Sequence, residues 1–370
     1  MRITRLEVIP IALPFRERYV TASGSLDARS MVVIRLHTES GHYGIGEAVP
    51  LSLRGGAGLD QVASELALCG PALAGSDIAA AASRDPAQIR LWIWEQLTRC
   101  RRQRVGPQVI GALDIALHDL AGRLSGLPMW RLLGATSVRE IACNASIDAR
   151  APQQAAELAA QLRAAGFTTF KVKVGTGDDI ERVAAVRSAV GHGIDIRTDA
   201  NGAWDLREAT ETLRGMQEHG IELAEQPCGA LSDLAELRVR TPIPVVADES
   251  VATLEDARKV IAARACDAAT LKLAKVGGPL EAIRIAAALP CFLSSALDGP
   301  IGIAAAIHTA QALPRGGYAG GLANGLATLG MFESVYARAD GLLGPVVVPP
   351  RAPGVGVEPD QNALDCLRLD

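Results

Sequence analysis

The sequence predicts an α/β protein in which a barrel of alternating strands and helices follows a smaller α+β unit. Three observations lead to this prediction. The chain has 370 residues, which is more than one average domain needs. Short β-branched segments alternate with Ala- and Leu-rich helical segments from about residue 140 onward. Charged residues recur at the ends of these predicted strands with a nearly constant spacing.

The N-terminal third carries the signals of an α+β unit. Residues 31–37 (MVVIRLH) alternate between two faces, and a Glu-Ser-Gly turn leads from them into a second short strand through Tyr43. Asp85 and Pro86 are typical of a helix N-cap and of the first helical position. A further helix, ending near Gly126, is indicated by apolar residues at 3-4-3-4 spacing: Ile110, Leu113, Leu117, Leu120 and Leu124.

The following two hundred or so residues predict about seven strand–helix units before residue 325. The strand candidates are TTFKVKVG, IDIRTDAN, IELAEQP, IPVVADES, AATLKLAK and PCFLSSALD, which begin at residues 168, 194, 221, 243, 268 and 290. Because strand and helix alternate strictly, the strands are expected to be parallel. The number of units favours a closed barrel, with a doubly wound open sheet as the alternative.

Composition argues against several functional classes. A net charge of −4 and a pI near 5.9 leave no basic surface for nucleic acid or anionic lipid. Charged residues interrupt the first apolar stretch, and no apolar run is long enough to span a membrane, so we expect a cytoplasmic protein. The cysteines are odd in number and far apart, which predicts reduced thiols rather than disulfides or a zinc site: Cys69, Cys100, Cys143, Cys228, Cys266, Cys291 and Cys366.

Six charged residues close successive predicted strands: Lys173, Asp199, Glu225, Asp248, Lys272 and Asp298. Their separations are 26, 26, 23, 24 and 26 residues, and one unit of a barrel takes roughly 25–30 residues. Since all strands of such a barrel open on one face at their carboxyl ends, these side chains are expected to converge on one cavity. Each alone would fit an ordinary helix cap; six in register favour a functional site.

Asp199, Glu225 and Asp248 lie on adjacent predicted strands, with no His or Cys among them. An all-oxygen set of this kind suits Mg²⁺, with Mn²⁺ as the alternative ion. Three carboxylates in a low-dielectric pocket would repel one another strongly without a cation. The sequence therefore predicts that these three residues bind a divalent metal ion.

Lysines on both sides of the predicted metal site indicate carbon-acid chemistry. A proton next to a carboxylate is very weakly acidic, so an enzyme must stabilise the enediolate that forms when the proton leaves. Lys171 and Lys173 are two residues apart on one strand and therefore share a face. We expect Lys173 to be the base, while Lys171 keeps it neutral by charge repulsion and can also bind the substrate carboxylate. Lys272 is expected opposite, as a second acid/base or as a stabilising cation.

These residues resemble the motifs of the enolase superfamily, in its muconate-lactonizing subgroup. The matching segments are Lys171-Val172-Lys173, Asp199-Ala200-Asn201, Glu225-Gln226-Pro227, Asp248-Glu249-Ser250 and Lys272-Leu273-Ala274-Lys275. The segments GIGEA at 44–48 and GALDIALHDLAGRLSGLPMWRLLG at 111–134 are similar to the capping domain of that family. The resemblance thus spans nearly the whole chain.

The resemblance implies a modified TIM barrel, (β/α)₇β, with an α+β capping domain made from the N-terminus and the C-terminal tail. The expected parts are residues 1–135 for the cap, 136–325 for the barrel and 326–370 for the returning tail. It also implies a small carboxylate substrate and a homo-oligomer. Two cap loops, 20–24 and 51–58, are expected to close over the substrate and set specificity through Thr21, Ser23 and Arg54.

Within that subgroup, the segments SSALDG at 294–299 and GLAT at 325–328 look most similar to o-succinylbenzoate synthases. The histidine base of the mandelate racemase branch has no counterpart, since His308 falls in the helix after Asp298. The implied reaction is dehydration of a succinyl-hydroxy-cyclohexadiene carboxylate, with a cation–π contact from Lys272 as the ring becomes aromatic. Further substrate-binding residues implied by the resemblance are Asn201, Ser295, Leu297 and Asp298.

Other functions fit parts of the pattern. N-succinylamino acid racemases, dipeptide epimerases and muconate-type cycloisomerases share the barrel, the metal site and the paired lysines. A metal-free aldolase would use Lys173 or Lys272 as a Schiff-base nucleophile, which three converging acids argue against. A non-catalytic barrel would be expected to have lost part of its ligand set, and the set predicted here is complete.

Overall fold

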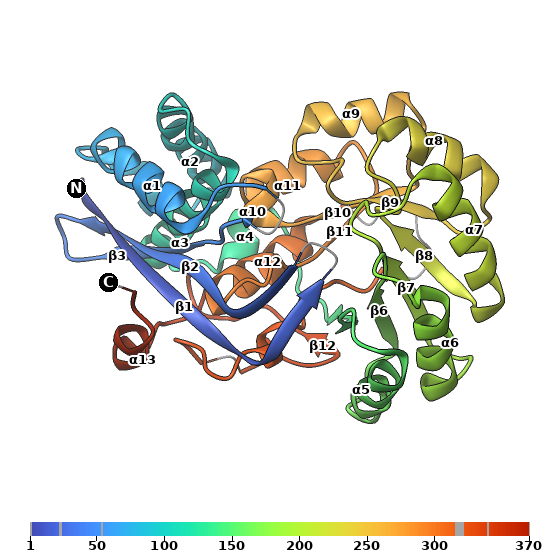
Figure 1. Cartoon of the computed structure of the whole chain (residues 1–370). Helices are drawn as coiled ribbons and strands as arrows, with labels where there is room; N and C mark the ends of the chain where they lie inside the picture. The colour runs from blue at the N-terminus through green and yellow to red at the C-terminus, as the bar shows by residue number, and fades with distance from the viewer. Residues whose placement is uncertain (1, 22–23, 53–54, 315–321, 339, 370) are drawn as a thin grey trace.

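The computed structural model describes residues 2–21, 24–52, 55–314, 322–338 and 340–369. Figure 1 shows a long β-sheet with several helices on one side and a barrel ringed by helices on the other. We call residues 2–134 the cap. This architecture confirms the predicted α/β fold class, a barrel with an α+β cap.

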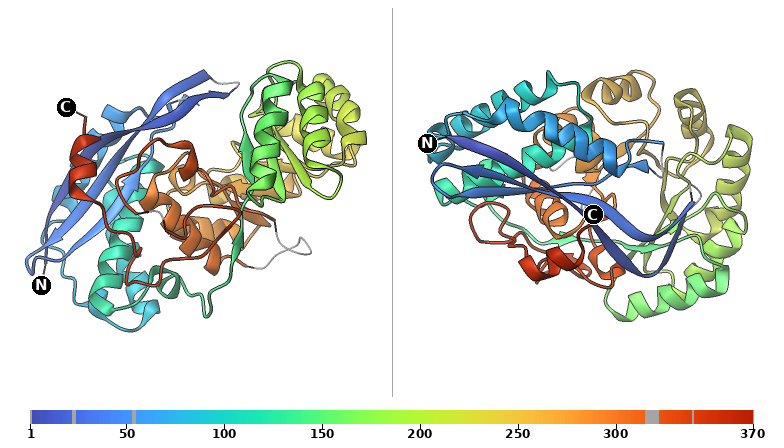
Figure 2. Two further views of the ribbon diagram at one scale, coloured as in Figure 1. Left: turned by 90° about the horizontal axis from the view of Figure 1, so that it is seen from below. Right: turned by 60° about the vertical axis from the view of Figure 1, so that its left-hand side comes forward.

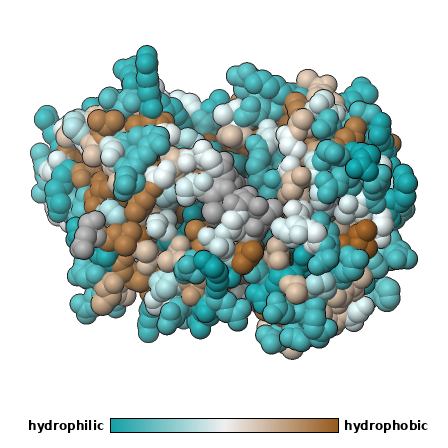
Figure 3. Space-filling view, in the orientation of Figure 1, coloured by the Kyte–Doolittle hydropathy of each residue, from teal (hydrophilic) through white to brown (hydrophobic). Residues whose placement is uncertain are grey.

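The cap sheet is an antiparallel meander of β1 (Ile3–Thr21), β2 (Gly24–Thr38) and β3 (Tyr43–Ala48). The predicted strands at 31–37 and near Tyr43 are therefore confirmed, and β1 adds a longer third strand. Figure 3 shows that apolar residues gather on this face of the molecule mainly over β1 and β2, whereas the barrel half is largely hydrophilic.

Helices α1 (Leu59–Leu73), α2 (Pro86–Arg101), α3 (Pro107–Ser125) and α4 (Met129–Leu132) complete the cap, with a short 3-10 turn at Ala80–Ala82. Asp85 caps α2 as predicted, since its side chain accepts a hydrogen bond from the Ala87 N–H. Helix α3 ends where Gly126 adopts the left-handed conformation, at φ 73°. Residues 108–122 of α3 are buried, because β3 packs on one side and α10 (Leu273–Val276) of the barrel on another.

The barrel strands are parallel and neighbour one another in chain order. They are β5 (Ala145–Ile147), β6 (Thr169–Lys173), β7 (Asp195–Asp199), β8 (Ile221–Glu225), β9 (Val245–Ala247), β10 (Ala268–Leu271) and β11 (Cys291–Leu293). The helices between them are α5 (Pro152–Ala164), α6 (Asp179–Val190), α7 (Leu206–Met216), α8 (Leu231–Arg240), α9 (Leu254–Ala262), α10 (Leu273–Val276) and α11 (Pro279–Ala286), with α12 (Pro300–Ala312) after β11 and a 3-10 turn at Gln217–His219.

A two-residue segment closes the ring between β11 and the start of β5. The Gly325 N–H donates to the Leu293 carbonyl, and the Ser295 N–H donates to the Gly325 carbonyl. On the other side, the Asn144 N–H donates to the Asn324 carbonyl. Asn324 and Gly325 thus serve as a short eighth strand, so the alternative of an open doubly wound sheet is wrong.

The residues that follow return to the cap. Strand β12 (Val346–Val347) pairs with β4 (Ile141–Ala142), and α13 (Gln361–Cys366) lies beside the cap sheet in Figure 2. The 3-10 turn at Leu329–Met331 precedes a hydrogen bond from the Glu333 N–H to the Pro14 carbonyl. The tail therefore connects the barrel wall to β1.

The described cysteines carry no disulfide, in agreement with the predicted reduced thiols. Five are buried, Cys291 is half-buried and Cys366 is exposed. Among the helices of the described ranges, none combines the length and the apolar character that crossing a membrane requires.

We predict that Gly44→Ala destabilises the protein. A Cβ at Gly44 would lie 2.2 Å from the Ala116 carbonyl oxygen in α3, so β3 and α3 would have to separate. The expected loss in the free energy of unfolding is about 1–3 kcal/mol, measured by urea denaturation. Gly58→Ala is the control, because its Cβ would have no neighbour within 4 Å. Equal stability of the two variants would contradict the close packing of β3 on α3.

Candidate active site

Five of the six charged residues predicted at strand ends meet at the mouth of the barrel. Lys173, Asp199 and Glu225 are the last residues of β6, β7 and β8, and Asp248 and Lys272 directly follow β9 and β10. All five are buried. The twist of a closed parallel sheet brings these strand ends to one opening, as the sequence spacing predicts.

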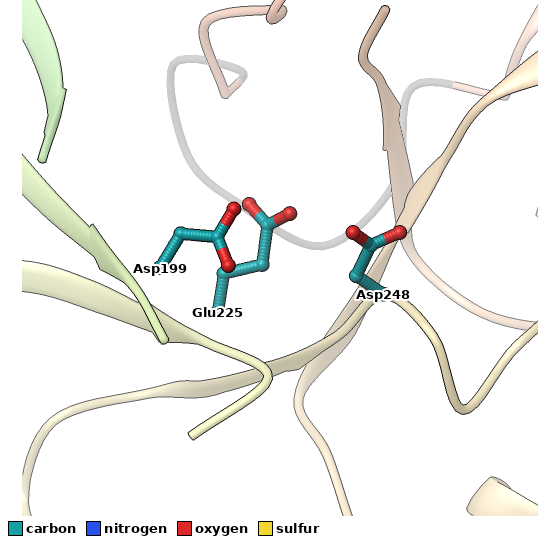
Figure 4. A group of neighbouring side chains, drawn as sticks. All are labelled: Asp199, Glu225 and Asp248. Carbon is teal, nitrogen blue, oxygen red and sulfur yellow. The ribbon is translucent and has the colours of Figure 1, made fainter. Parts of the chain in front are cut away.

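Asp199, Glu225 and Asp248 form what we call the acidic triad. One carboxylate oxygen from each lies within 4.8 Å of the others, and Figure 4 shows the three carboxylates pointing into a common space. Within the described residues, Oε2 of Glu225 is buried and has no hydrogen-bond partner. Three buried carboxylates with an unsatisfied oxygen are a donor set that could bind a metal ion.

Burial and charge act in opposite directions on these acids. Burial disfavours the ionised form of Asp199, but the ammonium groups of Lys171 and Lys173 outweigh it and lower the pKa of this carboxyl. For Glu225, burial outweighs the attraction of Lys171, and the charges of Asp199 and Asp248 add to it, so the pKa is raised. A bound cation would relieve this repulsion.

Four lysines surround the triad. Nζ of Lys171 lies 2.8 Å from Oδ2 of Asp199 and 2.7 Å from Oε1 of Glu225. Burial opposes its charge, but the neighbouring carboxylates outweigh burial and raise the pKa of Lys171. Nζ of Lys173 lies 2.6 Å from the same Oδ2 of Asp199, so the two ammonium groups are neighbours, as the K-x-K spacing predicts.

Lys272 approaches the triad from the opposite side and contacts the Asp248 carboxylate. Three strands separate it from β6, and those strands carry the triad, so Lys173 and Lys272 face each other across it. Lys275 is an addition to the predicted site, with Nζ 2.7 Å from Oδ1 of Asp248. Its position three residues after Lys272 could have indicated this, since such residues share one side of a helical turn.

Backbone geometry also fixes the strand ends. Asn201, Gln226 and Leu297 have positive φ values of 48°, 36° and 66°, which non-glycine residues rarely adopt. The Gln226 side chain accepts hydrogen bonds from the N–H groups of Asp248 and Ser250, at 2.8 and 3.1 Å. Such strain clusters at functional sites, where surrounding contacts hold it.

A cavity lies against the lysines, beneath the cap. The described residues lining it are Tyr19, Arg29, Leu51, Ser146, Lys171, Lys173, Asn201, Lys272, Ser294, Ser295, Ala296, Leu297, Gly325, Thr328 and Met331. None of these described residues is acidic. Arg29 is a second unpredicted member, and its guanidinium donates to the carbonyls of Pro50 and Ala296 at 2.6 and 2.9 Å. The sequence around Arg29 does not indicate that this residue belongs to the site, because the carbonyls that it binds are distant in sequence.

The predicted substrate-binding residues divide into three groups. Asn201, Ser295 and Leu297 line the cavity. Ser23 and Arg54 lie outside the described residues, as does the side chain of Thr21. Asp298 is a correction: it does not end a strand, because β11 stops at Leu293, and it lies behind the cavity wall instead of lining it.

Asp298 is held there by the loop that precedes it. Its Oδ2 accepts hydrogen bonds from the Ser295 hydroxyl at 2.9 Å and from the Ala296 N–H at 2.6 Å. A carboxylate turned back on its own loop is not available to the cavity. Asp298 follows Lys272 by 26 residues because one strand–helix unit of the barrel has about that length. It is in the loop between β11 and α12 rather than at the end of β11.

Known proteins with similar sequences or structures include epimerases, o-succinylbenzoate synthases and racemases. The chain is 31% identical over 314 residues to the L-Ala-D/L-Glu epimerase of Clostridium acetobutylicum, covering 82% of this chain and 84% of that protein. It is 41% identical over 187 residues to the o-succinylbenzoate synthase of Thermobifida fusca, covering 49% and 58%. The crystal structure of N-succinyl Arg/Lys racemase from Bacillus cereus superposes with a TM-score of 0.89 at 26% identity, covering 100% of this chain and 99% of that one.

Two family matches extend over most of the sequence. Residues 4–134 match the mandelate racemase / muconate lactonizing enzyme N-terminal domain. Residues 154–363 match the family described as enolase C-terminal domain-like. The cap and the barrel are matched separately and in the expected order, and we conclude that the chain belongs to the enolase superfamily of enzymes, in its mandelate racemase and muconate lactonizing enzyme group.

Proposed function

We propose that this enzyme uses Mg²⁺ to remove the proton next to a substrate carboxylate, and that its reaction is the dehydration carried out by o-succinylbenzoate synthases. The observation that carries the proposal is the placement of Lys173 and Lys272 on opposite sides of the acidic triad. A flat ring held between two lysines presents its proton to one of them and its developing charge to the other.

Asp199, Glu225 and Asp248 would hold the ion. Its fit to this site rests on the three buried carboxylates and on the unpartnered Oε2 of Glu225 described above. When bound, Mg²⁺ withdraws electron density from the substrate carboxylate and so makes the adjacent proton more acidic. The same donors also suit Mn²⁺.

Lys173 is the base in this proposal. Its Nζ is fixed at the cavity wall by Asp199 and by Oδ1 of Asn201, which lies 2.8 Å away. Lys171 lies beside it, two residues earlier on the same face of β6, and contacts the same Oδ2 of Asp199. Lys173 takes the proton from the substrate carbon and returns it to the hydroxyl that leaves on the same face, so that one water molecule is released. Lys272 stabilises the ring from the other face through its positive charge.

The charge of the cavity supports a substrate with a second carboxylate. The described lining residues include no Asp or Glu. Their basic members are Arg29 and three lysines that are paired with the triad behind them: Lys171, Lys173 and Lys272. A succinyl carboxylate would meet hydrogen-bond donors in this lining, whereas the free ammonium group of a dipeptide would meet no carboxylate among the described lining residues. This argues for succinylated substrates over dipeptides, although dipeptide epimerases are among the relatives.

A second candidate is racemisation of an N-succinylamino acid. A larger cavity of about 430 Å³ shares Tyr19, Ser146 and Met331 with the first and extends toward Leu158 and Leu162 of α5. Its lining combines apolar residues with charged ones, among them Arg16, Glu17 and Arg150, and so offers space for an amino-acid side chain, which the cyclohexadiene substrate lacks. Lysines on both faces would then each serve one enantiomer. A muconate-type cycloisomerase would use the same half-reaction, in which an enediolate forms next to a substrate carboxylate.

We predict that chelation abolishes activity and that Asp248→Asn lowers Mg²⁺ affinity by at least roughly tenfold, because removing one charged ligand weakens a hard cation site. Calorimetric titration with Mg²⁺ measures the affinity, and circular dichroism checks the fold. Glu222→Gln is the control: Glu222 is on β8 with Glu225 but pairs with Arg197 outside the triad, so it should leave Mg²⁺ affinity unchanged. Full activity in excess EDTA would disprove the metal requirement.

We predict different effects of the two lysines on α-proton exchange. Lys173→Ala should abolish turnover and exchange together. Lys272→Ala should reduce turnover by roughly 10²–10³, because a positioned charge in a dry site is worth a few kcal/mol, yet retain some exchange. Proton NMR in D₂O measures both.

The same experiment on both enantiomers of an N-succinylamino acid separates dehydration from racemisation. If each variant loses exchange from one enantiomer only, and the two variants lose opposite ones, the two lysines are acid and base for racemisation. The role of Lys272 as mainly a charge stabiliser would then be wrong.

A further inference from the structure

Two buried carboxyl groups, one from the cap and one from the barrel, face each other behind the cavity wall. Glu47 belongs to β3 and Asp298 to the loop before α12, and they are 4% and 7% exposed. A Cβ built on Gly302 would lie 2.7 Å from Oε1 of Glu47 and 3.1 Å from Oδ1 of Asp298. Both carboxyl groups therefore approach the same point beside α12, where only a glycine leaves room for them.

Glu47 joins three parts of the chain that are far apart in sequence. Its Oε1 accepts a hydrogen bond of 2.7 Å from the Gly299 N–H, at the start of α12. Its Oε2 accepts a hydrogen bond from the Tyr336 hydroxyl in the tail. The N-terminus of a helix favours a negative or hydrogen-bonding group of this kind. The cap strand is thus attached both to the barrel helix and to the tail.

Asp298 continues this connection to the cavity. The Ser295 hydroxyl donates to Asp298 and accepts hydrogen bonds from the Asp298 N–H at 2.8 Å and from the Thr328 hydroxyl at 3.1 Å. Ser295, Leu297 and Thr328 all line the cavity. Leu297 lies between them with its positive φ, a conformation that neighbouring contacts must maintain. The network on Asp298 supplies those contacts.

The two carboxyl groups cannot both ionise at low cost. Burial raises the pKa of Glu47 to about 7, and the charge of Asp298 acts in the same direction. Burial also raises the pKa of Asp298, against its hydrogen bonds and the charge of Arg29. Tyr336, whose pKa is raised far above its ordinary value, stays a proton donor. Burial and the charge of Asp298 therefore both favour the protonated form of Glu47.

We propose that Glu47 is a positioning residue: lying beside Asp298, it fastens the cap to the 295–299 segment through the Gly299 N–H and so shapes the wall against which the substrate binds. The inference rests on the proposed function only in taking this cavity as the substrate site. It assigns no chemistry to Glu47 itself, which is behind the wall and does not line the cavity.

Hydrogen exchange measured by mass spectrometry tests the attachment without any substrate. Glu47→Ala should speed amide exchange in the segment 295–302 by roughly tenfold or more, because it removes buried hydrogen bonds. Glu47→Gln, which keeps an acceptor for Gly299, should leave exchange within about twofold of the wild type. Asp119→Asn is the control, since this buried cap carboxyl bonds Ile45 and Val355 and is not attached to the 295–302 segment. Unchanged exchange in Glu47→Ala would overturn the proposal.

The pH dependence of stability tests whether Glu47 lies buried beside Asp298 in this attachment and so holds a proton more tightly than in the unfolded chain. Because the folded state binds this proton more tightly than the unfolded chain, the stability it contributes is complete in acid and is lost as the pH rises through about 7. The wild type should therefore lose thermal stability between pH 5.5 and 8 relative to Glu47→Gln, which cannot titrate. Parallel curves would overturn the burial of Glu47 beside Asp298 on which the attachment depends. This comparison also decides the question if Glu47→Ala fails to fold.

Binding of o-succinylbenzoate in the presence of Mg²⁺ tests the effect on the wall. Glu47→Ala should weaken binding by roughly tenfold and Glu47→Gln should restore it, with Mg²⁺ affinity equal in all three proteins. Equal o-succinylbenzoate affinity in Glu47→Ala and the wild type would overturn the positioning role. If the wild type itself does not bind this compound, the proposed function fails, and the exchange and pH experiments still decide the attachment.

Discussion

The mutual compensation of buried lysines and carboxylates at the barrel mouth is the interaction on which the site depends. Lys171, Lys173, Lys272 and Lys275 surround three carboxylates that are almost inaccessible to water. Removing one member of such a cluster leaves an uncompensated buried charge, which costs more than the pair contributes. The cluster therefore fixes the ends of β6 to β10 relative to one another. The same carboxylates could bind a metal ion, and the same lysines could then pair with a substrate carboxylate.

Much of this cluster could be predicted from the sequence, for a physical reason. A strand covered on both faces should be apolar, so a Lys or Asp at its end needs an explanation, and the barrel supplies one. Lys173, Asp199 and Glu225 end their strands, and Asp248 and Lys272 follow theirs by one residue. The prediction failed at Asp298, because the spacing gives the length of the unit but not where the strand stops within it.

Other features of the fold and the site could not be predicted from sequence patterns within single segments. Strand β5 has only three residues, and the closing strand at Asn324 and Gly325 has two, so neither shows a period. The GIGEA motif contains Glu47 but does not reveal its contact, because the amide that Glu47 binds is 252 residues away. Arg29 is similar, with one partner 267 residues distant. Contacts between the cap and the barrel are set by tertiary packing, which residue spacing within one element does not encode.

The proposed separation of roles, with proton removal on the barrel and substrate fit on the cap, accounts for the different activities of the relatives that match this chain. The residues proposed for proton removal are on the barrel strands, whereas the cap and tail supply Tyr19, Arg29, Leu51, Thr328 and Met331 to the cavity. We therefore expect changes in these walls to alter which carboxylate fits, without altering the lysines or the triad.

The return of the tail has a consequence for biosynthesis. The segment that closes the barrel, the wall residue Thr328 and the Tyr336 hydroxyl all come from the last fifty or so residues of the chain. A growing polypeptide can form the cap sheet and the first strand–helix units early, but its ring stays open until this segment has left the ribosome. The barrel therefore becomes competent to enclose a substrate only after this segment has emerged, and a chain truncated before it would expose its charged strand ends to water instead of assembling them.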